Sequence, residues 1–410
     1  QTLSLLGFVI NIERSKPNPT QKCRYLGFEI NSITMKLTLP NEKHTTVQSC
    51  AERILRTSSI TIRELAQFVG TLVSACPAVK YGWLYTKNLE REKWQALQKS
   101  QLNYRKKMQL GPGGREDLRW WITNASATKN QQSLILQNPV LEIYTDASTT
   151  GWGAVCEGRR ALGWWTSVEK QLHINQLELM GAFYGVKCFA KNLKACNILI
   201  RIDNTTAQYY INKMGSIRFP ALSATARNLW QWCEERDIYI QASHISSLAN
   251  FQADQASRAL PHDTEWELCP KAYQKIIDQL GKPGIDLFAT YQNTKCSKFI
   301  SWTFDPESIV IDAFTVSWTD KQFYAFPAFA LIHRTINKIV QDQAEGILVV
   351  PYWRSQPWFP LFVKLRTKKL LIFEPRNELL LSPSRTPHPL AHQLTLVATT
   401  LSGKHSSEKA

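Results

Sequence analysis

The sequence predicts a multidomain α/β protein with a mixed β-sheet flanked by helices at its centre. Between residues 141 and 258, apolar runs of strand length alternate with segments of helical periodicity. Their order is strand, strand, strand, helix, strand, helix, strand, helix, which is typical of a mixed sheet covered by helices. The chain has 410 residues, more than one domain usually holds, so we expect further domains on both sides.

The central elements can be placed one by one. The run 141–146 is the first strand, and Gly158-Arg-Arg is a turn that joins the next two strands into a hairpin. The run 197–203 lacks polar alternation, which is typical of a strand buried on both faces. The other elements are expected as strands at 151–157, 161–166 and 238–244, and as helices at 175–192, 205–213, 220–236 and 251–258.

Four acidic residues in this segment are candidate metal ligands. Asp146 and Asp203 end apolar strands, Glu178 lies at the start of a helical pattern, and Asp254 follows His244 by ten positions. Carboxylates brought together repel one another strongly unless cations neutralise them. Oxygen ligands of this kind suit two Mg²⁺ ions, for which Mn²⁺ can substitute.

Each of these residues also has a structural interpretation when it is taken alone. Asn175 to Glu178 matches a capping box, in which the glutamate bonds to the backbone of the cap residue. Asp146 and Asp203 could be turn residues at strand ends, and His244 could be a surface histidine. The occurrence of all four acids in one ordered segment favours the metal site.

The order and surroundings of these residues resemble RNase H. The matching motifs are Thr145-Asp-Ala-Ser, Glu178-Leu, Asp203-Asn, and His244 followed by Asn250-Phe-Gln-Ala-Asp. In that family the four carboxylates lie on the first strand, the first helix, the fourth strand and the last helix. The resemblance implies metal-assisted hydrolysis of the RNA strand in an RNA–DNA hybrid.

The resemblance also implies individual roles. Asp146 would bridge both metal ions, Glu178 and Asp203 would hold the metal near the leaving group, and Asp254 would complete the site that holds the water. Histidine is a suitable group for proton movement or product release, and this role falls to His244. The contact with the RNA 2′-hydroxyl would come from Asn204 and Thr205.

Composition supports a polyanionic partner. Lys and Arg number 49 against 33 Asp and Glu, which gives a net charge of +16, and nucleic acid is the usual partner of such a chain. The nine cysteines form no CxxC pair, which indicates reduced thiols in the cytoplasm or nucleus and argues against secretion. We expect no membrane association, because no apolar run reaches spanning length.

The part before residue 139 is predicted as short strands over residues 1–40 and mostly helices over 41–138. It resembles the end of a reverse transcriptase palm followed by a thumb or connection. Tyr25, Leu26 and Gly27 would then form the primer-grip hairpin. The family's Tyr-x-Asp-Asp turn is absent, so we expect no polymerisation by this chain alone, and we expect it to be part of a longer polyprotein whose upstream half is a partner.

Basic residues in the helical part could grip the backbone of the hybrid without reading its sequence. The alternative is a solvated charged face. The candidates are Lys87, Arg91, Arg105, Lys106 and Lys107.

Residues 263–375 are predicted as a Rossmann-like α/β domain, after an RNase H-like domain at 139–262. They resemble a phage-type adenine-N6 methyltransferase, in which Asp286 would border the S-adenosylmethionine site. The family's catalytic motif is Asn or Asp, then Pro-Pro, then an aromatic residue. Here it reads Phe326-Pro327-Ala328-Phe329. Since an apolar Phe326 cannot accept the adenine amino hydrogens, we expect neither methylation nor use of that cofactor.

Residues 376–410 are rich in Ser, Thr and Pro and are predicted as a flexible tail. The whole order of parts resembles the Pol protein of DIRS-type retrotransposons. The leading hypothesis is a hybrid-specific ribonuclease. The alternatives are a catalytically silent nucleic-acid-binding relic and, more weakly, an active adenine methyltransferase. An integrase is disfavoured because it would lack the Glu178 and His244 motifs.

Overall fold

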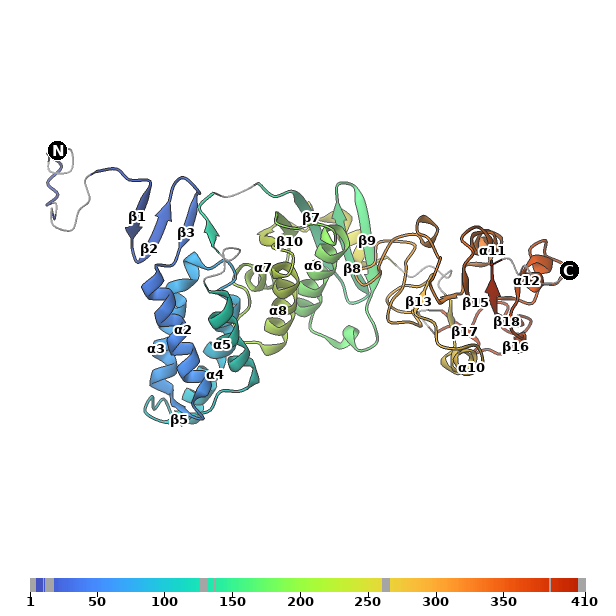
Figure 1. The fold of residues 1–410 in the computed structure, drawn as a ribbon, viewed down its shortest axis with the longest axis horizontal. Coiled ribbons are helices and arrows are strands. Elements are labelled where there is room, and N and C mark those ends of the chain that lie inside the picture. The colour runs from blue at the N-terminus through green and yellow to red at the C-terminus, as the bar shows by residue number, and fades with distance from the viewer. Residues whose placement is uncertain are drawn as a thin grey trace. The chain divides into compact units, whose positions relative to one another are not determined.

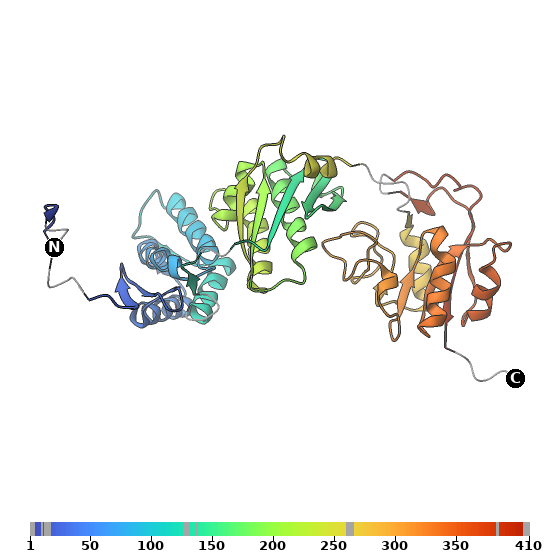
Figure 2. The same ribbon diagram turned by 90° about the horizontal axis from the view of Figure 1, so that it is seen from above.

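The computed structural model describes residues 5–9, 11, 18–125, 131–135, 138–259, 266–382 and 385–404 (Figures 1 and 2). It consists of two compact units. The first unit comprises Gln1–Val140, Lys194–Ile198 and Tyr209–Gln241, and the second unit comprises the remaining residues. The mixed α/β class with mixed sheets is confirmed, while the domain boundaries at residues 40, 138, 262 and 375 stay a prediction.

The first unit begins with a small antiparallel sheet. The tight turn between its first two strands places Leu26 and Gly27 at φ values of 48° and 80°, a left-handed conformation that glycine adopts without strain. The strands pair in the order β1-β2-β3-β6. Their bounds are Lys22–Tyr25 for β1, Phe28–Asn31 for β2, Lys36–Thr38 for β3 and Gln132–Ser133 for β6.

Helices make up most of the rest of the first unit. A complete capping box of Thr61 and Glu64 starts α3 and supplies acceptors for backbone N–H groups that have no partner in the first helical turn. The helices are α2 (Asn41–Arg56), α3 (Ile62–Ala75), α4 (Lys87–Lys99), α5 (Pro112–Asn124) and α8 (Pro220–Glu234), and a short ladder joins β4 (Ile60–Thr61) to β5 (Lys107–Met108).

Buried polar contacts fix α8 within this unit. The Glu234 carboxylate accepts hydrogen bonds from the Tyr85 hydroxyl at 2.5 Å and from Trp120 Nε1 at 2.7 Å. Arg227 pairs with the fully buried Asp117 at 2.9 Å. A buried charge is tolerated only when it is paired in this way.

The central sheet has five strands in the order β11-β10-β7-β8-β9. Strands β7, β8 and β9 pair antiparallel. The amide of Tyr239 donates to Cys196 O and the amide of Ile245 to Ile202 O. This constant offset means that β10 and β11 are parallel. The bounds are β7 Leu141–Ala147, β8 Gly151–Cys156, β9 Arg159–Trp164, β10 Asn197–Ile202 and β11 Tyr239–His244.

Small residues let helices lie close to this sheet. On α6 (Ile174–Ala190), a Cβ at Gly185 would lie 3.0 Å from Ala154 Cβ. A Cβ at Gly153 of β8 would lie 2.5 Å from Ala253 O of α9 (Phe251–Ser257). Both glycines therefore set the distance at which the two acid-bearing helices meet the strands. A further helix, α7 (Thr205–Asn212), follows β10.

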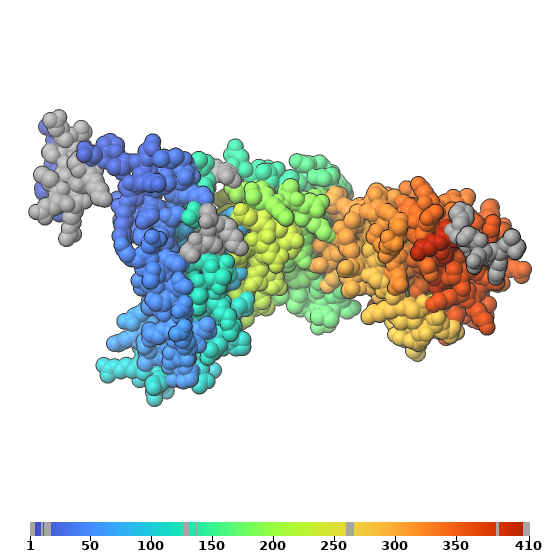
Figure 3. All heavy atoms as spheres, in the orientation of Figure 1, coloured from blue at the N-terminus to red at the C-terminus, as the bar shows by residue number. Residues whose placement is uncertain are grey.

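The C-terminal part of the second unit, coloured orange to red in Figure 3, has another mixed sheet, in the order β13-β14-β15-β18-β16. Strands β13 to β15 are parallel, and β18 is antiparallel to both neighbours. The strands are β13 (Ile285–Asp286), β14 (Phe323–Ala325), β15 (Glu345–Pro351), β16 (Leu371–Phe373) and β18 (Leu396–Ser402), with a small ladder of β12 (Glu267–Leu268) and β17 (Leu380–Leu381).

Alternate residues of β15 point to opposite faces of this sheet and pack into two separate hydrophobic cores. Leu348 and Val350 pack with α11 (Ile332–Gln341) and α12 (Phe359–Leu365) on one face. Ile347 and Val349 pack with α10 (Pro270–Leu280) on the other face. A strand buried on both faces reads as a continuous apolar run, and β15 fits that pattern.

The predicted flexible tail at 376–410 is wrong for its described part. Strand β18 lies between β15 and β16, and its residues Leu396 to Leu401 are buried. The run Leu394-Thr-Leu-Val-Ala-Thr-Thr-Leu401 has the β-branched and apolar composition of a buried strand, which the surrounding Ser, Thr and Pro residues concealed. No helix in the described ranges is long and apolar enough to cross a membrane.

Replacing Leu396 by alanine tests this placement. The side chain is fully buried in β18, so the Leu396→Ala variant should lower the free energy of unfolding by about 2–5 kcal/mol. Urea denaturation would measure the loss. The control is Ile372→Ala on the neighbouring strand, where the side chain is 45% exposed and the loss should stay below about 1 kcal/mol. Equal small losses in both variants would contradict a buried β18.

Candidate metal centre

Three of the predicted acids converge at one edge of the central sheet. Asp146 lies near the end of β7, Glu178 on α6, and Asp203 directly after β10. Each offers a carboxylate oxygen, and these oxygens all lie within 4.8 Å of one another. Such a spacing allows one cation to contact all three, whereas three bare carboxylates would repel one another.

The direction of the strands explains why Asp146 and Asp203 lie close together. The amide of Val140 donates to Asn197 O at 2.8 Å, where β7 and β10 begin. Asp146 and Asp203 each lie six residues further along their strands. Since the two acids meet, the strands run in the same direction, and their carboxyl ends share one edge of the sheet.

Electrostatics at this edge favour protonation in the metal-free protein. Burial, together with the charges of Asp146 and Asp203, raises the pKa of Glu178 to about 9. Burial also raises the pKa of Asp146 to about 6, although a hydrogen bond from Ser257 opposes the shift. For Asp146, burial and the neighbouring carboxylates outweigh the opposing charge of Arg258.

The donor set fits a hard divalent cation. Atom Oε2 of Glu178 is buried and has no hydrogen-bond partner within the protein, although such atoms are normally satisfied. The cluster consists only of carboxylates, the ligands that Mg²⁺ and Mn²⁺ prefer. A cation held by Asp146, Glu178 and Asp203 would supply the missing partner.

Two serines orient the carboxylates. Ser257 Oγ donates to Asp146 at 2.6 Å, and Ser247 Oγ donates to Asp203 at 2.7 Å. Asn250 Nδ2 donates to Thr145 O at 2.9 Å, which fixes the start of α9 against β7. The sequence interpretation missed both serines and included Asn250 only as part of the motif that ends at Asp254. Ser257 carried a usable signal, because it lies three positions after Asp254 on the same helix face.

Asp254 lies near the cluster but outside it. Its charge contributes to the raised pKa values of Asp146 and Glu178, yet its own carboxylate pairs with Arg258 Nη2 at 2.6 Å. The guanidinium therefore neutralises this acid in the metal-free protein. Because the pair is partly exposed, it contributes little to stability and can open readily.

The neighbouring predicted residues occupy different surroundings. His244 ends β11 and is exposed. Asn204 is engaged within the protein, since its Nδ2 donates to Asn175 Oδ1 at 3.0 Å and its Oδ1 accepts from the amide of Ala207 at 2.9 Å. It therefore caps the start of α7, whereas Thr205 beside it is exposed.

The basic candidates of the first unit fall into two groups. Lys87 lies 3.8 Å from Glu90, and Arg91 donates to Ser216 O at 3.1 Å. Both side chains therefore make contacts within the protein, although Arg91 Nε is buried and has no hydrogen-bond partner there. Arg105, Lys106 and Lys107 are exposed, as are Tyr25, Leu26 and Gly27 of the β1–β2 hairpin.

The methyltransferase-like candidates lie apart from the acid cluster in the fold. Asp286 is buried and accepts from the amides of Phe288 and Lys295 at 3.3 and 3.0 Å, while burial raises its pKa to about 6. Its carboxylate is thus used to shape the loop after β13. Phe326 follows β14 and lines a cavity of about 280 Å³, next to the buried Pro327. Phe329 packs on Trp353, with ring centroids 5.3 Å apart.

Among known proteins, this chain is similar to solved structures of RNase H1 and of a viral reverse transcriptase. No protein-family model matches this sequence, and no curated protein matches it. RNase H1 from the archaeon Halobacterium salinarum NRC-1 is 16% identical over 28% of this chain and 92% of its own, with a TM-score of 0.24. LC11-RNase H1 in complex with RNA/DNA hybrid is 18% identical over 28% of this chain and 92% of its own, with a TM-score of 0.25.

A viral polymerase structure matches a longer part of the chain. The foamy viral protease-reverse transcriptase in complex with RNA/DNA hybrid is 16% identical over 54% of this chain, with a TM-score of 0.25. This chain covers 29% of that protein's length.

The raised pKa values predict how pH affects the metal-free protein. Because the folded protein holds its protons more tightly than the unfolded chain, its free energy of unfolding should fall as pH rises from about 4 through 6 for Asp146 and through 9 for Glu178. The Glu178→Gln variant stays neutral, so it should be more stable than the wild type at pH 8 by about 1–3 kcal/mol.

Denaturation with urea in the presence of EDTA, at pH 5 and pH 8, would measure this difference. Adding Mg²⁺ at pH 8 should stabilise the wild type but not Glu178→Gln, because only the former keeps the full ligand set. The control is Glu378→Gln, which changes an exposed glutamate and should leave the pH profile unaltered. Identical profiles for wild type and Glu178→Gln would contradict the shifted pKa.

Proposed function

We propose that this chain is a ribonuclease that cleaves the RNA strand of RNA–DNA hybrids with two divalent metal ions. The observation that carries the proposal is the convergence of Asp146, Glu178 and Asp203 within 4.8 Å, with a buried, unpartnered oxygen on Glu178. A set of acids that is unstable without cations is what two-metal phosphodiester hydrolysis requires.

The three clustered acids would hold one Mg²⁺ ion, and Asp146 with Asp254 would hold the second. Bound there, the metal ions would lower the pKa of a water molecule and stabilise the departing 3′ oxygen. Mn²⁺ would substitute because it takes the same oxygen ligands. S-adenosylmethionine has no role in this proposal, since Phe326 offers no acceptor for an adenine amine.

The chain's own side chains would prepare this site. The hydroxyls of Ser257 and Ser247 hold Asp146 and Asp203 in fixed orientations, which lowers the reorganisation needed on binding. Arg258 would release Asp254 when a cation replaces its guanidinium. His244, exposed after β11, would move a proton or assist product release.

Charge supports nucleic acid as the substrate. The net charge of +16 would attract a polyanion, and the exposed run from Arg105 to Lys107 would contact its phosphates. The hairpin at Tyr25 to Gly27 would position a nucleic-acid strand as a primer grip. The exposed Thr205 and the second N–H of Asn204 Nδ2 would contact the RNA 2′-hydroxyl. We further propose that the chain belongs to a DIRS-type retrotransposon polyprotein of the cytoplasm or nucleus, with the upstream half of its polymerase as a partner.

The decisive experiment uses purified chain, Mg²⁺ and an end-labelled RNA–DNA hybrid, beside the same RNA as a single strand. The wild type should cut only the RNA of the hybrid. The Asp203→Asn variant should be slower by about 100-fold or more, because it removes one charged ligand of the catalytic ions. The amount of labelled product on a denaturing gel, followed over time, would give the rate.

The matched control is Asp278→Asn, which alters an exposed aspartate of α10 and should cut at the wild-type rate. Circular dichroism would establish that both variants are folded. Tight binding of the hybrid without cutting would overturn the nuclease and favour a silent nucleic-acid-binding protein. Methyl transfer to DNA from S-adenosylmethionine would instead support the methyltransferase alternative.

A further inference from the structure

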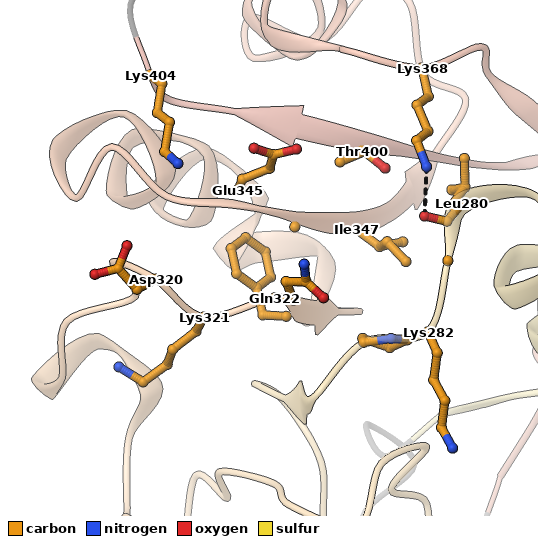
Figure 4. Close-up of a pocket in the computed structure, with 14 residues that line it drawn as sticks. Leu280, Lys282, Asp320, Lys321, Gln322, Glu345, Ile347, Lys368, Thr400 and Lys404 are labelled. Atoms are coloured by element: carbon orange, nitrogen blue, oxygen red, sulfur yellow. Dashed lines mark hydrogen bonds between the residues drawn. The ribbon is translucent and has the colours of Figure 1, made fainter.

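The C-terminal sheet has a second, unassigned cavity of about 420 Å³ (Figure 4). It lies where β14 and β15 begin, at Phe323 and Glu345, and beside Gly281, which ends α10. The cavity is therefore at the amino ends of the parallel strands. Phe326 lies at the opposite, carboxyl end of β14, so this cavity is distinct from the methyltransferase-like pocket.

Four lysines surround this cavity, and they come from four separate segments. In Figure 4 the side chains of Lys368 and Lys404 extend from one rim toward the cavity, whereas Lys282 and Lys321 extend outward from the other rim. Lysine carries its charge on a flexible stem, so the outer two can swing inward. Among the described residues, none of the four ammonium groups makes an ion pair with a carboxylate within 4.0 Å.

Two of the four lysines donate a hydrogen bond to a backbone carbonyl oxygen. Lys368 Nζ donates to Leu280 O at 2.8 Å, which caps the last turn of α10. Lys321 Nζ donates to Ser317 O. An ammonium group has three donors, so both retain capacity for a further acceptor. Asp320 and Glu345 also line the cavity, which leaves a net charge of about +2 there.

A buried hydroxyl on the cavity wall provides an independent observation. Thr400 of β18 is only 7% exposed, and its Oγ1 has no hydrogen-bond partner within the protein. Figure 4 shows this side chain below its strand, between Glu345 and Lys368. An unpartnered buried hydroxyl lowers stability. An oxygen-rich ligand in the cavity would supply the acceptor.

We propose that this cavity binds phosphate groups. Lysine ammonium groups and a threonine hydroxyl are common donors to phosphate oxygens, and the volume lies within the usual range of ligand sites. The phosphates can belong to a nucleic-acid strand or to a free pyrophosphate-bearing molecule, because the same atoms are recognised in both. The site requires neither the acid cluster nor a metal ion.

The test measures binding in EDTA, so that the candidate metal centre is inactive. Inorganic pyrophosphate is titrated by calorimetry, and a fluorescent ten-nucleotide DNA strand by anisotropy. The variant Lys282→Gln with Lys404→Gln changes two exposed lysines whose ammonium groups donate no described hydrogen bond. The affinity for the probe that uses the site should fall by about tenfold. If that probe is the DNA strand, the magnitude of the slope of log K against log salt should also fall by about 1.4.

Two comparisons make the test specific. Thr400→Val removes the hydroxyl while keeping the side-chain shape; it should weaken phosphate binding severalfold while leaving the unfolding midpoint at or above that of the wild type. The double change Lys271→Gln with Lys298→Gln alters charge equally at two exposed lysines that do not line the cavity, and it should bind like the wild type.

The outcomes separate the two sources. Weakened binding of pyrophosphate only would assign the site to free phosphates, and weakened binding of the strand would assign it to nucleic acid. If the cavity variants bind both probes as the wild type and the Lys271 and Lys298 control do, the phosphate site is overturned. Because no metal is present, that failure would leave the nuclease proposal untouched.

Discussion

Repulsion between carboxylates at the shared edge of β7 and β10 is the constraint on which the central sheet depends. The acids Asp146, Glu178 and Asp203 lie within 4.8 Å of one another, and two of them are buried. In the metal-free protein this arrangement is tolerated because the pKa values of Asp146 and Glu178 rise. A cation bound between these carboxylates would therefore stabilise the folded protein.

The surrounding fold is arranged to hold that unfavourable cluster in place. Gly185 and Gly153 let α6 and α9 lie close against the strands, and Ser257 and Ser247 donate to two of the carboxylates. Electrostatic strain at a functional site is thus offset by close packing elsewhere in the domain.

In the other parts of the chain, some polar groups hold the fold together, whereas others remain able to bind a ligand. Asp286 looked like a cofactor residue in the sequence, but its carboxylate is consumed by two backbone amides. Arg91 looked like a phosphate contact, but it donates to Ser216 O. By contrast, Lys282 and Lys404 drew no attention in the sequence, and they come together only because the amino ends of β13 to β15 meet the end of β18. A charged residue is available to a ligand only when the fold leaves it a spare donor or acceptor.

The sequence by itself determined the order of the central elements and the identity of the clustered acids, because strand and helix periodicity and acids at strand ends are local features. It failed at 376–404, where Ser, Thr and Pro concealed the buried strand β18. Only the tertiary structure decided which acids touch, that Asp254 pairs with Arg258, and that Thr400 lacks a partner. Those outcomes depend on contacts between residues far apart in the chain, which no local pattern encodes.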